Sequence, residues 1–128
     1  DERRRATGMA MVLISHDLGV VRGRADEVCV MYRGRVVERG LVGQVFGGAI
    51  HPYTRALVAC SPRIDRKPGR LATIDDAMAD GTMMKEFEAQ VGKRAWWPGE
   101  ADAALEMVGA NRWVAVANGE IRSDQMAK

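Results

Sequence analysis

The chain is poor in the residues that build metal centres and disulfide frameworks. Its 128 residues include two cysteines and two histidines. Cys29 and Cys60 lie far apart, with no CxxC motif and no paired histidines at metal-ligand spacing, which argues against a metal site. Cys29 stands in an apolar strand pattern and Cys60 ends an apolar helix pattern, so both are predicted to be small core residues.

The chain also lacks the features of a membrane-inserted or polyanion-binding protein. No apolar run approaches the roughly 18 residues that a membrane-spanning helix needs, and the amino-terminal residues do not form a signal peptide. A net charge of +2 argues against a nucleic-acid partner and against a polybasic membrane anchor. With 47% hydrophobic and 28% charged residues, the composition is that of a small globular domain.

The most informative segment is an apolar run followed by three polar residues. Met9–Ile14 reads as a buried strand of a parallel sheet, and the flanking Gly8 and Ser15 favour a strand over a buried helix. Ligands of open α/β sheets bind beyond the carboxyl ends of strands, which makes His16 a candidate catalytic residue. The alternative is that His16 is a turn or capping residue with a solvated ring. Asp17 is expected to cap the helix that follows.

Apolar spacing and turn residues predict the other elements. Trp96 and Trp97, beside a proline, are expected to form a local core under a turn, with an exposed aromatic anchor as the alternative. Helices are expected at 1–7, 17–25, 41–47, 52–60 and 82–93, and Asp80 or Thr82 is expected to cap the last of them. Strands 27–32 and 35–38 are expected to form a hairpin around Arg33-Gly34. A further strand is expected at 113–117, followed by a hairpin signal at Asn118-Gly119.

Two stretches of sequence carry a family resemblance. The phrase LISHDLGVV, the hairpin that follows it, and the sequence HPYT at 51–54 with its apolar helix and Pro-Arg pair span about residues 8 to 65. This part of the chain resembles the switch-histidine region of the ATP-binding subunits of ABC transporters, in the branch that imports oligopeptides, dipeptides and nickel. His51 itself is expected to cap or pack rather than to react.

The resemblance implies a fold and a role. The fold class would be α/β: the C-terminal portion of a P-loop ABC ATPase domain at residues 1–60, a linker at 61–80, and a small α+β tail of uncertain role at 81–128. His16 would contact the γ-phosphate of ATP, which is bound with Mg²⁺ in the full-length parent. The implied partners are a second ABC ATPase subunit and transmembrane permease subunits, and the implied location is cytoplasmic, peripheral on the inner face of the cell membrane.

The departures from the family are equally informative. The 128 residues contain no GxxxxGK[ST] loop, glutamine loop, LSGGQ-like signature or acidic strand end for magnesium. We therefore expect no ATP hydrolysis by this chain alone, and its simplest explanation is a C-terminal piece of a longer ABC protein or a truncated gene product. The cysteine-rich tail that holds an iron-sulfur cluster in many such importers is also missing.

Two further interpretations remain open at the level of sequence. The chain could be a stand-alone, non-enzymatic interaction module that keeps only the ancestry of an ABC ATPase. A hydrolase built on His16 and Asp17 is weaker, since no GxSxG motif marks a nucleophile. In either case, a strand at Met9–Ile14 without its sheet neighbours would promote self-association.

Overall fold

The computed structural model describes residues 2–61, 73–79, 81–100 and 103–117. Within these ranges the chain is a mixed α/β structure with one four-stranded antiparallel sheet. In chain order the elements are α1 (Glu2–Thr7), α2 (Leu18–Arg24), β1 (Glu27–Tyr32), β2 (Arg35–Leu41), α3 (Val42–Gly47), α4 (Pro52–Ala59), α5 (Ile74–Met78), α6 (Thr82–Val91), β3 (Ala103–Gly109) and β4 (Arg112–Ala117).

The sheet joins two hairpins that are far apart in sequence. Its strand order is β1-β2-β4-β3, and the two hairpins meet where β2 pairs with β4, with Glu38 opposite Val114 and Arg39 opposite Trp113. Residues 103–117 therefore complete the sheet that residues 27–41 begin.

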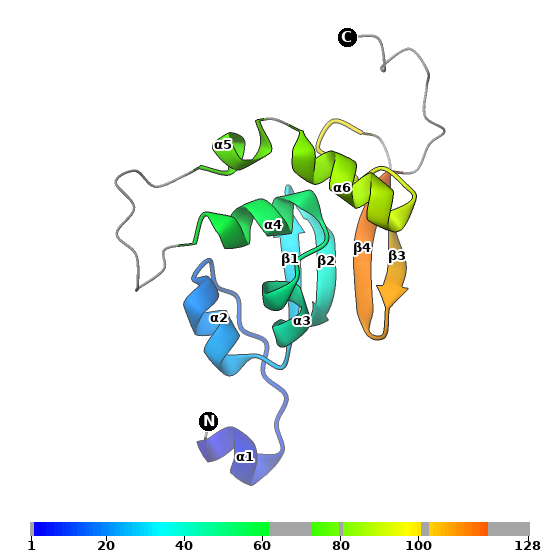
Figure 1. The fold of residues 1–128 in the computed structure, drawn as a ribbon. Coiled ribbons are helices and arrows are strands. Elements are labelled where there is room, and N and C mark those ends of the chain that lie inside the picture. The colour runs from blue at the N-terminus through cyan, green and yellow to red at the C-terminus, as the bar shows by residue number, and fades with distance from the viewer. Residues whose placement is uncertain (1, 62–72, 80, 101–102, 118–128) are drawn as a thin grey trace, which may run out of the picture.

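Helices α3, α4 and α6 lie on one side of the sheet, whereas α1 stands apart from it at the amino-terminal end (Figure 1). Phe87 of α6 is fully buried against Val114 and Val116 of β4. A second cluster joins Val45 of α3 to the β1–β2 hairpin, and a third joins α2 to α3. The buried members of the three clusters are Val21, Val30, Val37, Val42, Val45, Phe46, Ile50, Phe87, Ala95, Trp96, Val114, Ala115 and Val116.

The predicted turn between β1 and β2 is confirmed. Arg33 and Gly34 have φ values of 49° and 79°, which is the left-handed pair that a two-residue hairpin turn requires. A glycine at the second position meets this requirement without steric cost.

The predicted strand at Met9–Ile14 is wrong. Residues 9–15 form no helix or strand, and Val12 and Ile14 are 89% and 94% exposed. A strand gains its stability from hydrogen bonds to neighbouring strands and from burial of its faces. In the described part of the chain no strand pairs with this run, so apolar composition alone does not make it a strand.

The predicted burial of Cys29 is also wrong. Residues 27, 29 and 31 form the exposed set of β1, because side chains alternate between the two faces of a strand. The face that carries Cys29 is not the one the helices cover. Cys60 at the end of α4 is half-buried.

The predicted helices at 17–25, 41–47, 52–60 and 82–93 are confirmed as α2, α3, α4 and α6, within one or two residues at each end. The capping prediction for α6 is wrong for Thr82, because Gly81 takes the N-cap position and no side chain caps it. Asp80 lies outside the described residues. Trp96 is buried, as predicted.

Two parts of the chain that follow α4 differ from the sequence prediction. The described portion of the expected linker contains α5. At the start of this helix, the side chains of Thr73 and Asp76 each accept a hydrogen bond from the backbone N–H of the other residue. The partner of β4 is the preceding strand β3, which sequence analysis missed, and Asn111 in the turn between them has a φ of 53°. The hairpin signal at Asn118-Gly119 and residues 62–72 lie outside the described residues.

Candidate functional site

His16 lies immediately before α2, one residue ahead of the helix N-cap. The Asp17 carboxylate accepts hydrogen bonds from the backbone N–H groups of Gly19 at 2.8 Å and Val20 at 3.2 Å, which confirms the predicted cap. The hydroxyl of Ser15 accepts a hydrogen bond from the Asp17 N–H at 3.0 Å. The backbone on the carboxyl side of His16 is thereby held in a defined conformation.

The imidazole of His16 is exposed. It makes no hydrogen bond with any other residue that the structure describes. An exposed imidazole beside a fixed helix start can donate a hydrogen bond to a ligand oxygen without first breaking a protein contact. The structure thus leaves the ring of His16 accessible, whereas the capping role belongs to Asp17.

His51 has a different environment from His16. It is fully buried, its Nδ1 accepts a hydrogen bond from the Tyr53 N–H at 3.2 Å, and its ring is edge-on to Phe87 at 5.7 Å between centroids. Because Nδ1 accepts, the neutral ring carries its proton on Nε2, which donates to the Trp96 carbonyl at 3.2 Å. Burial lowers the pKa of His51 to about 4, partly offset by the Trp96 carbonyl, which raises it.

The arrangement around His51 confirms that it caps and packs. Its side chain is the N-cap of α4, and Pro52 occupies the first helical turn, where a missing N–H costs nothing. The HPYT sequence is therefore a helix start that is tied to the Trp96 segment, 45 residues further along the chain.

A buried carboxylate supports the same helix start from the other side. Glu38 of β2 is fully buried, and its two oxygens accept hydrogen bonds from the N–H groups of Ile50 and His51, each at 3.0 Å. Arg112 of β4 donates to the same carboxylate from Nη2 at 2.7 Å and from Nε at 3.2 Å. The guanidinium compensates the buried charge, because a carboxylate is expensive to bury without a partner.

We call Glu38, Ile50, His51 and Arg112 the Glu38 cluster. It joins β2, the start of α4 and β4, and Arg112 extends it by donating to the Gly48 carbonyl. All polar groups in it that face the carboxylate are hydrogen-bond donors of the protein itself, so the carboxylate oxygens are occupied by internal partners. It is an anchor for the HPYT segment rather than a catalytic centre.

A half-exposed aromatic group lies beside this cluster. The rings of Tyr32 and Tyr53 stack at 4.0 Å between centroids with 13° between their planes, and Trp97 is tilted against Tyr32 at 5.4 Å. Burial, together with the neighbouring Tyr32, raises the pKa of Tyr53. The stack fastens the β1–β2 turn to α4 through apolar contact.

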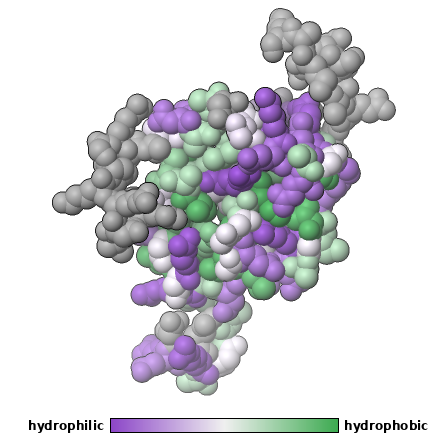
Figure 2. Space-filling model, viewed as in Figure 1, coloured by the Kyte–Doolittle hydropathy of each residue, from purple (hydrophilic) through white to green (hydrophobic). Residues whose placement is uncertain are grey.

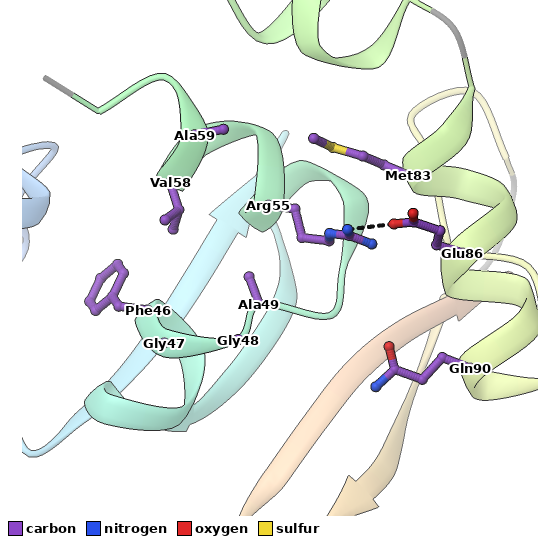
Figure 3. Close-up of a pocket in the computed structure, with 10 residues that line it drawn as sticks. All are labelled: Phe46, Gly47, Gly48, Ala49, Arg55, Val58, Ala59, Met83, Glu86 and Gln90. Carbon is purple, nitrogen blue, oxygen red and sulfur yellow. Dashed lines mark ion pairs between the residues drawn. The ribbon is translucent and has the colours of Figure 1, made fainter. Parts of the chain in front are cut away.

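A cleft opens between α4 and α6. It has a volume of about 760 Å³, and its lining comes from the end of α3, from α4 and from α6 (Figure 3). Arg55 of α4 points across it to Glu86 of α6, with which it forms an ion pair. Hydrophobic and hydrophilic residues are intermixed over the face of the molecule that Figure 2 shows.

Comparison with known proteins finds one family and several relatives that are similar to part of the chain. Residues 37–93 match the family described as "Oligopeptide/dipeptide transporter, C-terminal region". The dipeptide transport ATP-binding protein DppF of Escherichia coli (strain K12) is 53% identical over 58 residues, which are 45% of this chain and 17% of that protein. This part of the chain is similar to the ATP-binding subunits of peptide transporters.

Two further relatives support the assignment. The oligopeptide transport ATP-binding protein OppD of Salmonella typhimurium (strain LT2) is 42% identical over 74 residues, which are 58% of this chain and 22% of that protein. The glutathione import ATP-binding protein GsiA of Escherichia coli (strain K12) is 49% identical over 61 residues, 48% of this chain and 10% of that protein. The chain thus spans about a fifth or less of the length of these curated relatives. No solved structure matches the chain.

The comparisons confirm the resemblance found in the sequence, and the HPYT segment lies inside the matched family region. Sequence analysis missed Glu38 and Arg112 as a pair, since nothing local in the sequence links residues 74 positions apart. The described residues contain no group of three or more His, Cys, Asp or Glu that could hold a metal ion. None of the helices described is both long and apolar enough to cross a bilayer.

Proposed function

We propose that the chain is the C-terminal part of the ATP-binding subunit of an ABC importer for peptides or related solutes. The observation that carries this proposal is the combination of an exposed, unpartnered His16 beside the Asp17-capped helix with the family match at residues 37–93. The ATP-binding relatives, at 42% to 53% identity over the matched segments, support the same role.

His16 would contact the γ-phosphate of ATP. Bound ATP with its Mg²⁺ supplies the phosphoryl group and the leaving group. An imidazole N–H can donate a hydrogen bond to a phosphate oxygen. Phosphoryl transfer depends mainly on positioning and on stabilisation of charge, so one well-placed donor has a large effect.

Residues 1–60 would belong to the P-loop ATPase domain of the complete subunit, in which other parts of the subunit would cover the apolar run Met9–Ile14. The 89% exposure of Val12 and 94% exposure of Ile14 support this, because an apolar run needs a partner to remove it from water. Residues 81–128 would form a tail whose strands extend the sheet of the β1–β2 hairpin, as the pairing of β2 with β4 indicates.

The remaining ATPase elements would come from other parts of the subunit and its assembly. The sequence has no Gly-rich phosphate loop, so this chain alone is proposed not to hydrolyse ATP. The partners would be a second ATPase subunit and transmembrane permease subunits, and the location would be the cytoplasmic face of the membrane.

A second function is supported by the Glu38 cluster. Strands β1 to β4 form one sheet, and residues of α3 and α6 pack with it into core clusters, so this part of the chain could act as a stand-alone, non-enzymatic interaction module. In that case His16 would have no catalytic task.

The experiment that separates the two functions begins with the native gene. We expect the reading frame upstream of the Asp1 codon to encode a phosphate loop and an LSGGQ-like signature. In the complete gene product, with its permease partners in proteoliposomes, His16→Ala should lower ATP hydrolysis by about 100-fold, since loss of one charge-stabilising donor typically costs that much.

The matched control is Lys85→Ala, an exposed position on α6, which should leave ATP hydrolysis unchanged. Nucleotide binding of the His16→Ala protein should persist, because most contacts to ATP would come from elsewhere. Unchanged ATP hydrolysis in His16→Ala would overturn the role proposed for His16. A stop codon followed by a start near Asp1 would overturn the ATPase assignment in favour of the interaction module.

A further inference from the structure

The cleft between α4 and α6 has the dimensions of a small-ligand site. Its volume of about 760 Å³ lies within the roughly 300–1,000 Å³ that is typical of sites for small molecules. Three structural elements line it, and two of them, α4 and α6, face each other across it (Figure 3). The cleft is separate from His16 and from the Glu38 cluster, which contribute none of its lining residues.

One positive and one negative side chain meet across this cleft. Arg55 and Glu86 form an ion pair, with 31% and 50% of their side chains exposed. An ion pair exposed to this extent contributes only about 0–1 kcal/mol to stability. A ligand can therefore separate the two charges at little cost, provided that it offers a partner to each of them.

Apart from Gln90, the remainder of the lining is apolar side chain or open backbone. Phe46, Val58 and Met83 supply apolar walls. Gly47 lines the cleft with nothing within 4 Å of the position where a Cβ would stand, so a ligand can approach the backbone there. Gln90 adds an amide that can donate or accept a hydrogen bond.

We propose that this cleft binds a small zwitterion with an apolar side chain, namely an amino acid or a dipeptide. Its carboxylate would pair with Arg55, its ammonium group with Glu86, and its side chain would lie against Phe46, Val58 and Met83. A ligand with a single charge would leave either the guanidinium or the carboxylate of the cleft without its partner. A neutral ligand would have to compete with the existing ion pair.

The choice of a peptide-derived zwitterion over other zwitterions rests on the proposed function. In the energy-coupling subunit of a peptide importer, such a site would sense the solute that has been delivered to the cytoplasm. α4 carries both Arg55 of the cleft and, at its N-cap, His51 of the Glu38 cluster. Occupancy of the cleft would therefore act directly on α4, the helix that starts within the HPYT segment.

The test is isothermal titration calorimetry on the full 128-residue chain with leucyl-leucine, leucine and N-acetyl-leucine amide. We expect saturable binding of leucyl-leucine or leucine, and binding at least about tenfold weaker for the neutral amide, which forms no charge-assisted hydrogen bond. Arg55→Gln and Glu86→Gln should each weaken binding of the zwitterion by about tenfold. Lys85→Ala, next to Glu86 but outside the cleft lining, should bind like the unmodified chain.

Three outcomes would overturn the proposal: no saturable binding of either zwitterion at ~10 mM, equal affinity for the neutral amide, or the same loss in Lys85→Ala as in Glu86→Gln. The neutral amide tests the unmodified chain, so the proposal stays testable if a variant fails to fold. The titration contains no nucleotide, and the ATPase assay of His16→Ala contains no cleft ligand. Failure of one proposal is therefore distinguishable from failure of the other.

Discussion

Glu38 and Arg112 are 74 residues apart in sequence and form a buried ion pair, with 2.7 Å between Oε1 of Glu38 and Nη2 of Arg112. The Glu38 side chain is fully buried and that of Arg112 is 13% exposed. The same carboxylate receives the N–H groups of Ile50 and His51 at the start of α4. The Glu38 side chain of β2 therefore holds both the start of α4 and strand β4.

Arg112→Ala should destabilise the chain strongly, because it leaves a buried carboxylate without its cation. We expect a loss of about 3 kcal/mol in the free energy of unfolding, measured by urea denaturation. The control is Arg39→Ala, which removes the exposed ion pair with Glu27 and should cost about 1 kcal/mol or less. Equal losses in the two variants would show that the Glu38–Arg112 pair is not an anchor.

The stability of the chain should fall with acidification through the titration of His51. Its folded-state pKa of about 4 lies below the ordinary value of 6.5, so the unfolded chain binds the additional proton between these values. The contribution of the neutral His51 ring to the free energy of unfolding is complete above about pH 6.5. It is lost as the pH falls toward 4, by about 3 kcal/mol at most.

The measurement for His51 is the pH dependence of the free energy of unfolding, compared with that of His51→Gln. The variant should show a shallower dependence between pH 4 and pH 6.5. His16→Gln, a change at the other histidine of the chain, should keep the full slope. An unchanged slope in His51→Gln would contradict the assignment of a neutral, buried ring.

Asp17→Ala should weaken α2 at its first turn. Its carboxylate accepts two backbone N–H groups, and loss of such a cap costs about 1 kcal/mol. Local amide hydrogen exchange of Gly19 and Val20 would report the change. Asp17→Asn keeps an oxygen acceptor at the N-cap and should restore most of the protection; faster exchange in Asp17→Asn than in Asp17→Ala would refute the capping role.

Gly34→Ala should destabilise the β1–β2 hairpin, because Gly34 has a φ of 79°, which alanine adopts only with strain. We expect a cost of about 1 kcal/mol in the free energy of unfolding. Gly43→Ala on α3 is the matched control, since a Cβ there meets nothing within 4 Å and φ is not in the left-handed region. Alanine at Gly43 should be neutral or slightly stabilising. The prediction fails if both variants have the same midpoint in urea.

Local signals in the sequence were sufficient for most elements near the HPYT segment. The Arg33-Gly34 turn, the Asp17 cap and Pro52 in the first turn of α4 all follow from the conformational limits of single residues. The capping role of His51 and the burial of Trp96 were also predicted. Such features depend on neighbours a few positions away, which the sequence displays directly.

Two of the errors, at Met9–Ile14 and at Cys29, have one physical cause. Met9–Ile14 was expected to be a buried strand, but burial requires a partner surface, and in the described part of the chain β2 pairs with β1 and β4 instead. Cys29 was placed in the core because its neighbours are apolar, yet the alternation of β1 turns it to the exposed face. Composition reports how apolar a segment is and not which surface covers it.

The sequence by itself determined the family resemblance, the starts of α2 and α4 and the candidacy of His16, because these depend on short patterns of residue type. Only the tertiary structure decided that β4 joins β2, that Arg112 neutralises Glu38, and that Arg55 faces Glu86 across a cleft. These contacts link residues far apart in the chain, and their partners are selected by packing and by compensation of buried charge rather than by any local preference of the backbone.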